Sequence, residues 1–206
     1  MTTEAGHPLK LTIAAGSLAR FLPLLGQGFR IAGGAGGSVE QFICRECGIS
    51  ADYLNDRVQT VFLNGKAIDD LRSAEVTDGA TLALSAAMPG LAGAVLRRGG
   101  AYAAMRRQIS HDGRGAAAAS GTVRVRVKLF NLVARDLGPA FFKRGVLVPG
   151  ADLKEFLHRL GTGLSSICRS AQWQGRAVAC SDMAGAVRED AWVVLQVVES
   201  ESGYSA

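Results

Sequence analysis

The chain has 206 residues, of which 48% are hydrophobic and 20% are charged, enough apolar side chains for one large or two small packed cores. The 26 glycines follow no three-residue period and no apolar heptad persists, which excludes collagen-like and coiled-coil chains. The net charge is +5, and residues 91–120 hold most of the excess, with five basic side chains and one acidic one.

The first half of the chain predicts two strands followed by a helix. Residues 9–13 alternate apolar and polar side chains, and residues 29–31 supply a second extended run. Ser38, with Gln41 three residues later, has the pattern of a capping box, and an apolar stripe at helical spacing follows it. Gly48 suits the left-handed turn that ends a helix.

A hairpin and a closing strand complete the first half. Asn64-Gly65 favours a tight turn whose two central residues need positive φ. The longest stretch without a charge covers residues 79–96, and a Pro-Gly pair breaks it. It therefore predicts a strand over residues 81–85 and then a loop, rather than a membrane span.

The second half repeats this order of elements. The repeated features are an alternating strand over residues 123–129, a strand over 146–148, a helix capped by Asp152 and Glu155 and ended by Gly161, a turn at Gly175 and a strand over 191–198. Because the last strand is apolar at nearly every position, we expect it to lie centrally in its sheet.

The two halves therefore form an internal repeat. The segments that begin the two helices, 38–43 and 152–157, align at a constant offset of 114 residues. Each half has the order strand, strand, helix, strand, strand, which suits one small sheet covered by one helix. We predict an α+β fold of two tandem ubiquitin-like β-grasp domains. The predicted boundaries are 7–90 for the first domain, 91–121 for a basic Ala/Gly/Arg linker, 122–199 for the second domain and 200–206 for a C-terminal tail.

Three short motifs show a family resemblance. They are VRVKLFNLVARDLG over residues 125–138, the helix after Pro149-Gly150, and the Asp78-Gly79 turn before a closing apolar strand. Together they resemble the bacterial ubiquitin-like sulfur carriers, namely the thiamine sulfur carrier and the small subunit of molybdopterin synthase. The resemblance implies a β-grasp fold and a protein partner, either an adenylating enzyme or an enzyme of thiamine or molybdopterin-type cofactor synthesis.

The C-terminal residues differ from that family. Its members hold sulfur on a C-terminal Gly-Gly whose carboxylate is adenylated and converted to a thiocarboxylate, whereas residues 203–206 here read GYSA. We therefore expect a non-enzymatic, sulfur-carrier-like protein that docks on partner proteins and uses no cofactor. An alternative is a carrier precursor that is cut after Gly100, because residues 96–100 (LRRGG) are similar to the tail of ubiquitin. Gly99 and Gly100 would then form the carrier tail.

Basic side chains are the candidate docking or anion-binding residues. They lie in the linker and on the strand that begins the second half: Arg97, Arg98, Arg106, Arg107, Arg124, Arg126 and Lys128. Arginine offers paired donors to carboxylate or phosphate. An anion or nucleic-acid binding module is thus an alternative from another class. Aromatic residues are only 6% of the chain and none interleaves with the strand's basic stripe, so we expect an acidic protein surface as the partner.

The remaining reactive groups predict no enzyme. Cys44 and Cys47 form one CxxC pair without a second, and Cys47 falls on the apolar stripe of its helix. We therefore expect core residues there rather than a metal or redox site. Four cysteines are too few for a disulfide-built scaffold, and residues 1–15 lack a signal-peptide pattern, so we expect a reduced, cytoplasmic protein.

Overall fold

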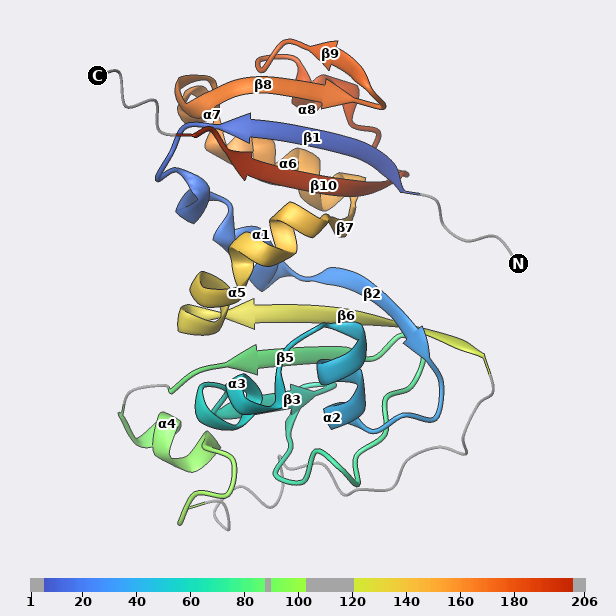
Figure 1. Ribbon diagram of the computed structural model, residues 1–206, viewed down its shortest axis with the longest axis vertical. Helices are drawn as coiled ribbons and strands as arrows, with labels where there is room; N and C mark the ends of the chain where they lie inside the picture. Colours follow the sequence, from blue (N-terminus) through green and yellow to red (C-terminus); the bar gives the residue numbers. More distant parts are fainter. Residues whose placement is uncertain (1–5, 88–89, 103–120, 202–206) are drawn as a thin grey trace. The chain divides into compact units, whose positions relative to one another are not determined.

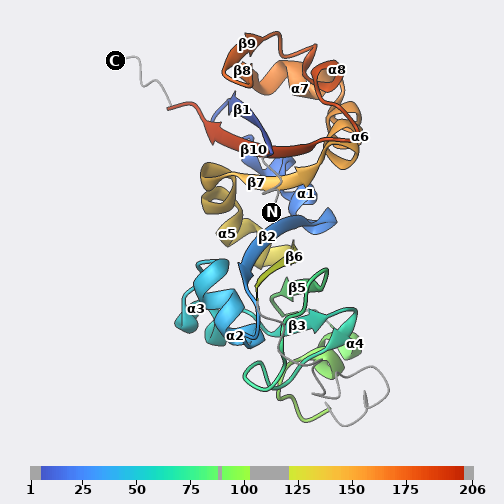
Figure 2. The ribbon, with the colours of Figure 1, turned by 90° about the vertical axis from the view of Figure 1, so that its right-hand side faces the viewer.

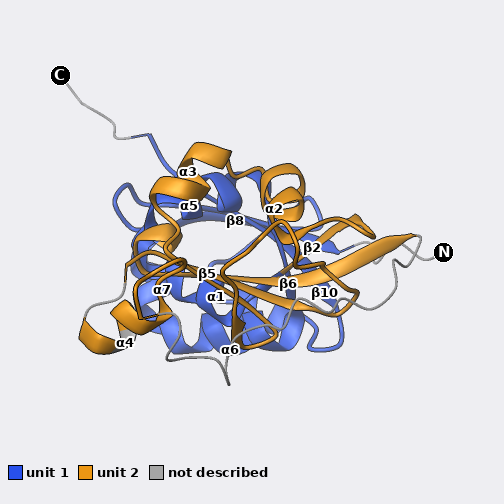
Figure 3. Cartoon of the chain, turned by 90° about the horizontal axis from the view of Figure 1, so that it is seen from below, with its two compact units in different colours: residues 1–29, 135–206 blue, residues 30–134 orange. Residues whose placement is uncertain are grey.

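The computed structural model describes residues 6–87, 90–102 and 121–201, which form ten β-strands and eight α-helices (Figure 1). The strands pair in both parallel and antiparallel fashion, so the expected mixture of helices and strands is confirmed. The chain divides into two compact units (Figure 3). Unit 1 contains residues 1–29 and 135–206, and unit 2 contains residues 30–134. Among the described helices, none has the length and apolar character needed to cross a membrane.

Five strands build the sheet of unit 1. In spatial order they are β7 (Val146–Pro149), β10 (Trp192–Glu199), β1 (His7–Ile13), β8 (Cys168–Trp173) and β9 (Arg176–Val178). The predicted central place of the last strand is confirmed, because β10 lies between β7 and β1. Strand β1 runs parallel to β10 and antiparallel to β8.

The main helix of unit 1 packs an apolar stripe against this sheet. Helix α6 (Gly150–Leu160) buries Leu153, Phe156 and Leu157, and it lies behind β1 and β10 in Figure 1. It begins two residues before Asp152, so the predicted cap at Asp152 is wrong. Pro149 occupies the cap position in an extended conformation, and Asp152 lies in the first turn, where its charge favours the helix dipole. The other helical elements are the 3-10 turn at Leu18–Arg20, α1 (Leu22–Gln27), α5 (Asn131–Arg144), α7 (Thr162–Ile167) and α8 (Met183–Ala186).

An aromatic cluster links three segments of unit 1. Phe21 is fully buried, and its ring lies edge-on to Phe142 with centroids 6.2 Å apart and 5.7 Å from the ring of Phe156. Phe29 packs on Phe141 with tilted rings, whose centroids are 5.1 Å apart. These pairs tie the segment after β1 and the helix α5 to α6.

Five other strands build the sheet of unit 2. In spatial order they are β4 (Lys66–Ala67), β3 (Thr60–Leu63), β5 (Thr81–Ser85), β6 (Thr122–Phe130) and β2 (Phe29–Gly34). Strand β5 is antiparallel to β3 and parallel to β6. Figure 2 shows α2 and α3 on one side of these strands and α4 on the other.

The predicted capping box of unit 2 is confirmed. The Ser38 hydroxyl accepts a hydrogen bond from the Gln41 amide at 3.2 Å, and the Gln41 side-chain oxygen accepts one from the Ser38 amide at 3.1 Å. The helix that follows is α2 (Val39–Gln41), continued by a π-helical turn over Phe42–Glu46, and Gly48 with φ of 70° comes after its end. Two further helices were not predicted, namely α3 (Ala51–Asp56) and α4 (Gly90–Leu96).

Both predicted hairpin turns are present. Asn64 and Gly65 have φ of 51° and 79° between β3 and β4, and Gln174 and Gly175 have the same two values between β8 and β9. Two successive positive φ angles match the right-handed twist of the flanking strands. The Asn-Gly signal therefore predicted the turn correctly.

The repeats exchange their first strands. We expected contiguous domains over 7–90 and 122–199, yet β1 completes the sheet of unit 1 while β6 completes that of unit 2. The connections fit this exchange, because strands that form a hairpin are joined by a short turn. Helix α1 separates β1 from β2, and the 14-residue α5 separates β6 from β7, so neither pair is joined as a hairpin.

Asn131 fixes the end of β6 to the end of β5 through side-chain hydrogen bonds. Its φ is 46°, its side-chain oxygen accepts a hydrogen bond from the Ala86 amide at 3.0 Å, and its side-chain nitrogen donates to the Ser85 hydroxyl at 2.8 Å. Asparagine tolerates this left-handed backbone better than most residues. One side chain thus joins the end of β5 to the start of α5.

Replacing Asn131 by alanine should lower the free energy of unfolding by about 2–3 kcal/mol, since backbone strain adds to the loss of two hydrogen bonds. Asn131→Gly relieves the strain but not the hydrogen-bond loss, so it should cost roughly 1 kcal/mol less. Urea denaturation of the three proteins checks this order. Equal stability of the alanine and glycine variants would contradict the role of the backbone.

Candidate docking face of unit 2

Strand β6 separates apolar and basic side chains onto opposite faces. Val123, Val125, Val127 and Leu129 are at most 2% exposed and form part of the core of unit 2. On the other face Arg124 and Arg126 are exposed and Lys128 is half-buried. This follows from the alternation of a strand, in which successive side chains point to opposite faces. The predicted basic stripe is therefore present as one continuous surface.

An exposed aromatic ring extends the stripe. Phe130 occupies the next position on the same face and keeps 41% of its surface accessible. No aromatic side chain interleaves with the three cations, as expected, but Phe130 follows them at the end of the strand. The position of Phe130 could have been predicted from the sequence, because the two-residue period of the strand continues from Lys128 to Phe130. We define the docking face as Arg124, Arg126, Lys128 and Phe130.

The neighbouring strands add small and basic side chains. Thr81 and Ala83 of β5 lie in register with Arg126 and Lys128. On β2, a Cβ atom added at Gly33 would lie 2.8 Å from the Phe42 ring, so Gly33 faces the helices. Arg30 is three residues earlier and therefore faces the other way.

The docking face is consequently free of carboxylates from the facing positions of β2, β5 and β6. These positions hold Arg30, Ala32 and Gly34 on β2 and Thr81, Ala83 and Ser85 on β5. The carboxylate of Asp78 lies at the end of the stripe, where it accepts a hydrogen bond from the Arg124 backbone amide at 2.7 Å. Cations grouped in this way attract an acidic surface.

Of the predicted linker arginines, Arg98 is held by hydrogen bonds. Arg98 is half-buried, its amide donates to the Gln59 carbonyl at 2.7 Å and its guanidinium to the Leu54 carbonyl at 3.3 Å. Burial lowers the pKa of Arg98, opposed by the charges of Glu40 and Asp69. Arg98 therefore acts as an anchor for the end of α4. Arg97 is exposed, and Arg106 and Arg107 lie outside the described residues.

The candidate carrier tail is also held. The Gly99 amide donates to an Asp69 carboxylate oxygen at 2.9 Å, and the Gly100 amide donates to the Arg97 carbonyl at 3.1 Å. Gly99 has φ of 63°, a turn conformation that favours glycine. A tail that threads into the active site of another enzyme would have to break these hydrogen bonds.

The two cysteines of the CxxC pair are free thiols in the helical segment after Ser38. Cys47 is buried in the helix stripe, as predicted, and Cys44 is half-buried. Burial, with a smaller effect from the Glu40 charge, raises the pKa of the Cys44 thiol and so disfavours the reactive thiolate. Within residues 6–87, 90–102 and 121–201, no three His, Cys, Asp or Glu side chains cluster in a way that could hold a metal ion.

Sequence reasoning missed a disulfide in unit 1. Cys168 at the start of β8 bonds to Cys180, which follows β9, with Cα atoms 6.1 Å apart. The hairpin between them brings the two ends together, a proximity that a spacing of twelve residues does not reveal by itself. Disulfides persist in oxidising compartments and are rare in the cytosol, so this bond argues against the reduced setting we expected. The cytoplasmic location stays a prediction.

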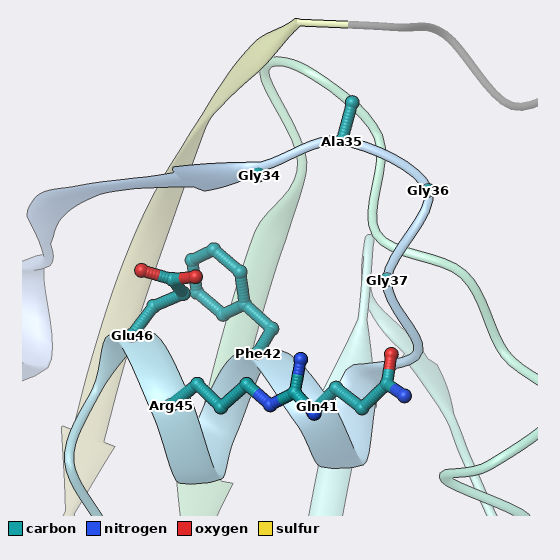
Figure 4. A pocket seen from close by; sticks show the side chains of 8 residues that line it. All are labelled: Gly34, Ala35, Gly36, Gly37, Gln41, Phe42, Arg45 and Glu46. Atoms are coloured by element: carbon teal, nitrogen blue, oxygen red, sulfur yellow. The ribbon is translucent and has the colours of Figure 1, made fainter.

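The glycine-rich loop after β2 borders a hollow of about 260 Å³ (Figure 4). Its lining consists of Gly34, Ala35, Gly36, Gly37, Gln41, Phe42, Arg45 and Glu46. The hollow combines one cation with one carboxylate, and the Phe42 ring forms part of its wall. Arg45 and Glu46 oppose each other in charge, so the hollow lacks the net positive charge of an anion site.

No family model, no curated protein and no solved structure matches this chain. Its function therefore has to be inferred from its own residues, among which the docking face groups three cations and an exposed aromatic ring on one strand.

Proposed function

We propose that this protein is a non-enzymatic docking module that binds an acidic surface of a partner protein through the docking face of unit 2. The observation that carries the proposal is the continuous row of Arg124, Arg126, Lys128 and exposed Phe130 on one face of β6. Guanidinium groups pair with carboxylates through two parallel hydrogen bonds, and an exposed ring supplies apolar area beside them.

We also propose that each unit is of the β-grasp type, with its first strand contributed by the other repeat. Support comes from unit 2, where a helix segment covers a sheet in which β5 runs parallel to β6. The resemblance to bacterial ubiquitin-like sulfur carriers makes an adenylating enzyme or a cofactor-synthesis enzyme the partner we propose. The hydrogen bonds that hold Gly99 and Gly100 favour docking over a carrier tail.

Reversing the charge of the docking face should weaken partner binding at least about tenfold. In the triple variant Arg124→Glu, Arg126→Glu, Lys128→Glu, repulsion between carboxylates replaces attraction. The partner is isolated by affinity capture on the wild-type protein from native extract and purified. We expect its affinity for the variant to fall at least about tenfold, and its affinity for the wild type to weaken as salt rises.

The matched control carries the same change in net charge on unit 1. Lys10, Arg169 and Arg176 are exposed there, and their replacement by Glu should leave binding of the partner unchanged. Equal binding by both triple variants would refute the assignment of the docking face. Recovery of nucleic acid in place of protein, lost after nuclease treatment, would favour the alternative of a nucleic-acid binding module.

A further inference from the structure

We propose that residues 1–100 and residues 101–206 are obligate partners, so that cutting the chain after Gly100 leaves a two-chain complex. This inference is independent of the docking function, because it rests on the pairing of β1 and β6 alone. Each half is the partner of the other, because it lacks one central strand of its own sheet and supplies the strand that the other half lacks.

The first half supplies β1 to unit 1. All seven residues of β1 pair with β10, and five of them also pair with β8, so β1 is an interior strand. Leu9, Leu11 and Ile13 are at most 1% exposed. Backbone hydrogen bonds extend the pairing at both ends, from the Gln174 amide to the Pro8 carbonyl at 2.8 Å and from the Ser200 amide to the Ile13 carbonyl at 2.7 Å.

The second half supplies β6 to unit 2. Five residues of β6 pair in parallel with β5, and the apolar side chains of β6 are buried beneath the helices. Further hydrogen bonds run from the Gly79 amide to the Arg124 carbonyl at 2.9 Å and from the Arg126 amide to the Ala80 carbonyl at 2.8 Å. Asn131 adds its two side-chain hydrogen bonds to the end of β5.

Separation of the halves would therefore open both sheets. Without β6, strand β5 would become an unprotected edge above an exposed core, and without β1 the strands β10 and β8 would lose the neighbour between them. Two self-contained domains would suffer neither loss. If the chain is cut after Gly100, residues 101–206 therefore remain as a subunit of the product and are not released.

Specific proteolysis of the folded chain tests this directly. A recognition sequence for a site-specific protease is inserted between Gly100 and Ala101, and the cut protein is analysed by size-exclusion chromatography with light scattering. We expect one species at the mass of the uncut chain, persisting at micromolar concentration. Two separately eluting species, each with the mass of one half, would overturn the proposal.

A cysteine cross-link distinguishes exchanged strands from halves that only adhere. Thr81 lies in register with Arg126. Thr12 is the equivalent of Arg126 in the first repeat, 114 residues earlier, so Thr12 would lie opposite Thr81 if the strands were not exchanged. Under mild oxidation we expect T81C/R126C to form a disulfide that joins the two halves, identified by peptide mass mapping, and T81C/T12C to form none. A disulfide in T81C/T12C and none in T81C/R126C would overturn the proposal that the strands are exchanged. The pair Ala83→Cys, Lys128→Cys repeats the test one step along the same register.

Discussion

Replacing Phe21 by alanine should lower the free energy of unfolding by about 3–5 kcal/mol. Phe21 is fully buried, and its ring meets Phe142 and Phe156 at centroid distances of 6.2 and 5.7 Å. Alanine would remove these aromatic contacts and leave a cavity between α5 and α6, which the surrounding helices can fill only in part. Thermal or urea denaturation measures the effect.

Phe130→Ala is the matched control for this prediction, because the chemical change is identical. Phe130 is 41% exposed, so its truncation should alter the free energy of unfolding by less than about 1 kcal/mol. It removes apolar area from the docking face, so partner binding should weaken while stability is retained. Similar losses of stability in the two variants would contradict the burial that separates Phe21 from Phe130.

Gly150→Ala should be strongly destabilising although it adds only one methyl group. The added Cβ would collide with the backbone carbonyl of Arg188 and would lie 2.9 Å from the carbonyl oxygen of Ala191. Neither is a flexible side-chain end, and the Gly150 amide is itself bound to the Ala191 carbonyl at 2.7 Å. Because α6 and the segment before β10 must move apart, we expect a loss of about 3 kcal/mol.

Gly185→Ala provides the control for this substitution. Gly185 lies within α8 and an added Cβ would meet no atom within 4 Å, so helix propensity predicts a gain of up to about 1 kcal/mol. Denaturation curves of the two variants should therefore shift in opposite directions. A neutral effect of Gly150→Ala would show that the close approach of α6 to the loop before β10 is not required for stability.

The candidate site was foreseen only in part. The stripe of Arg124, Arg126 and Lys128 followed from the two-residue period of a strand, a local property that tertiary structure leaves unchanged. The placement of Arg30 beside the docking face depends on the fold, because it follows from Gly33 facing the Phe42 ring on the other side of β2. The linker arginines were predicted as docking residues because they are basic, like the stripe. Arg98 instead anchors the end of α4 through hydrogen bonds to two backbone carbonyls.

The sequence by itself determined the local elements. The Ser38 capping box, the Asn64-Gly65 turn and the alternation in β1 and β6 each depend on a few adjacent residues whose backbone preferences act without the rest of the chain. Such signals identify an element and its buried face. They do not identify its neighbours.

Only the tertiary structure decided which strands are paired. Strands β1 and β6 begin equivalent repeats and have the same alternating pattern, so either sheet could accept either strand on local grounds. The choice depends on long-range packing: the aromatic cluster that places α1 and α5, and the registers of β1 with β10 and of β6 with β5. The Cys168–Cys180 bond is different, because it closes the local hairpin of β8 and β9 and became visible only once the pairing of these two strands was known.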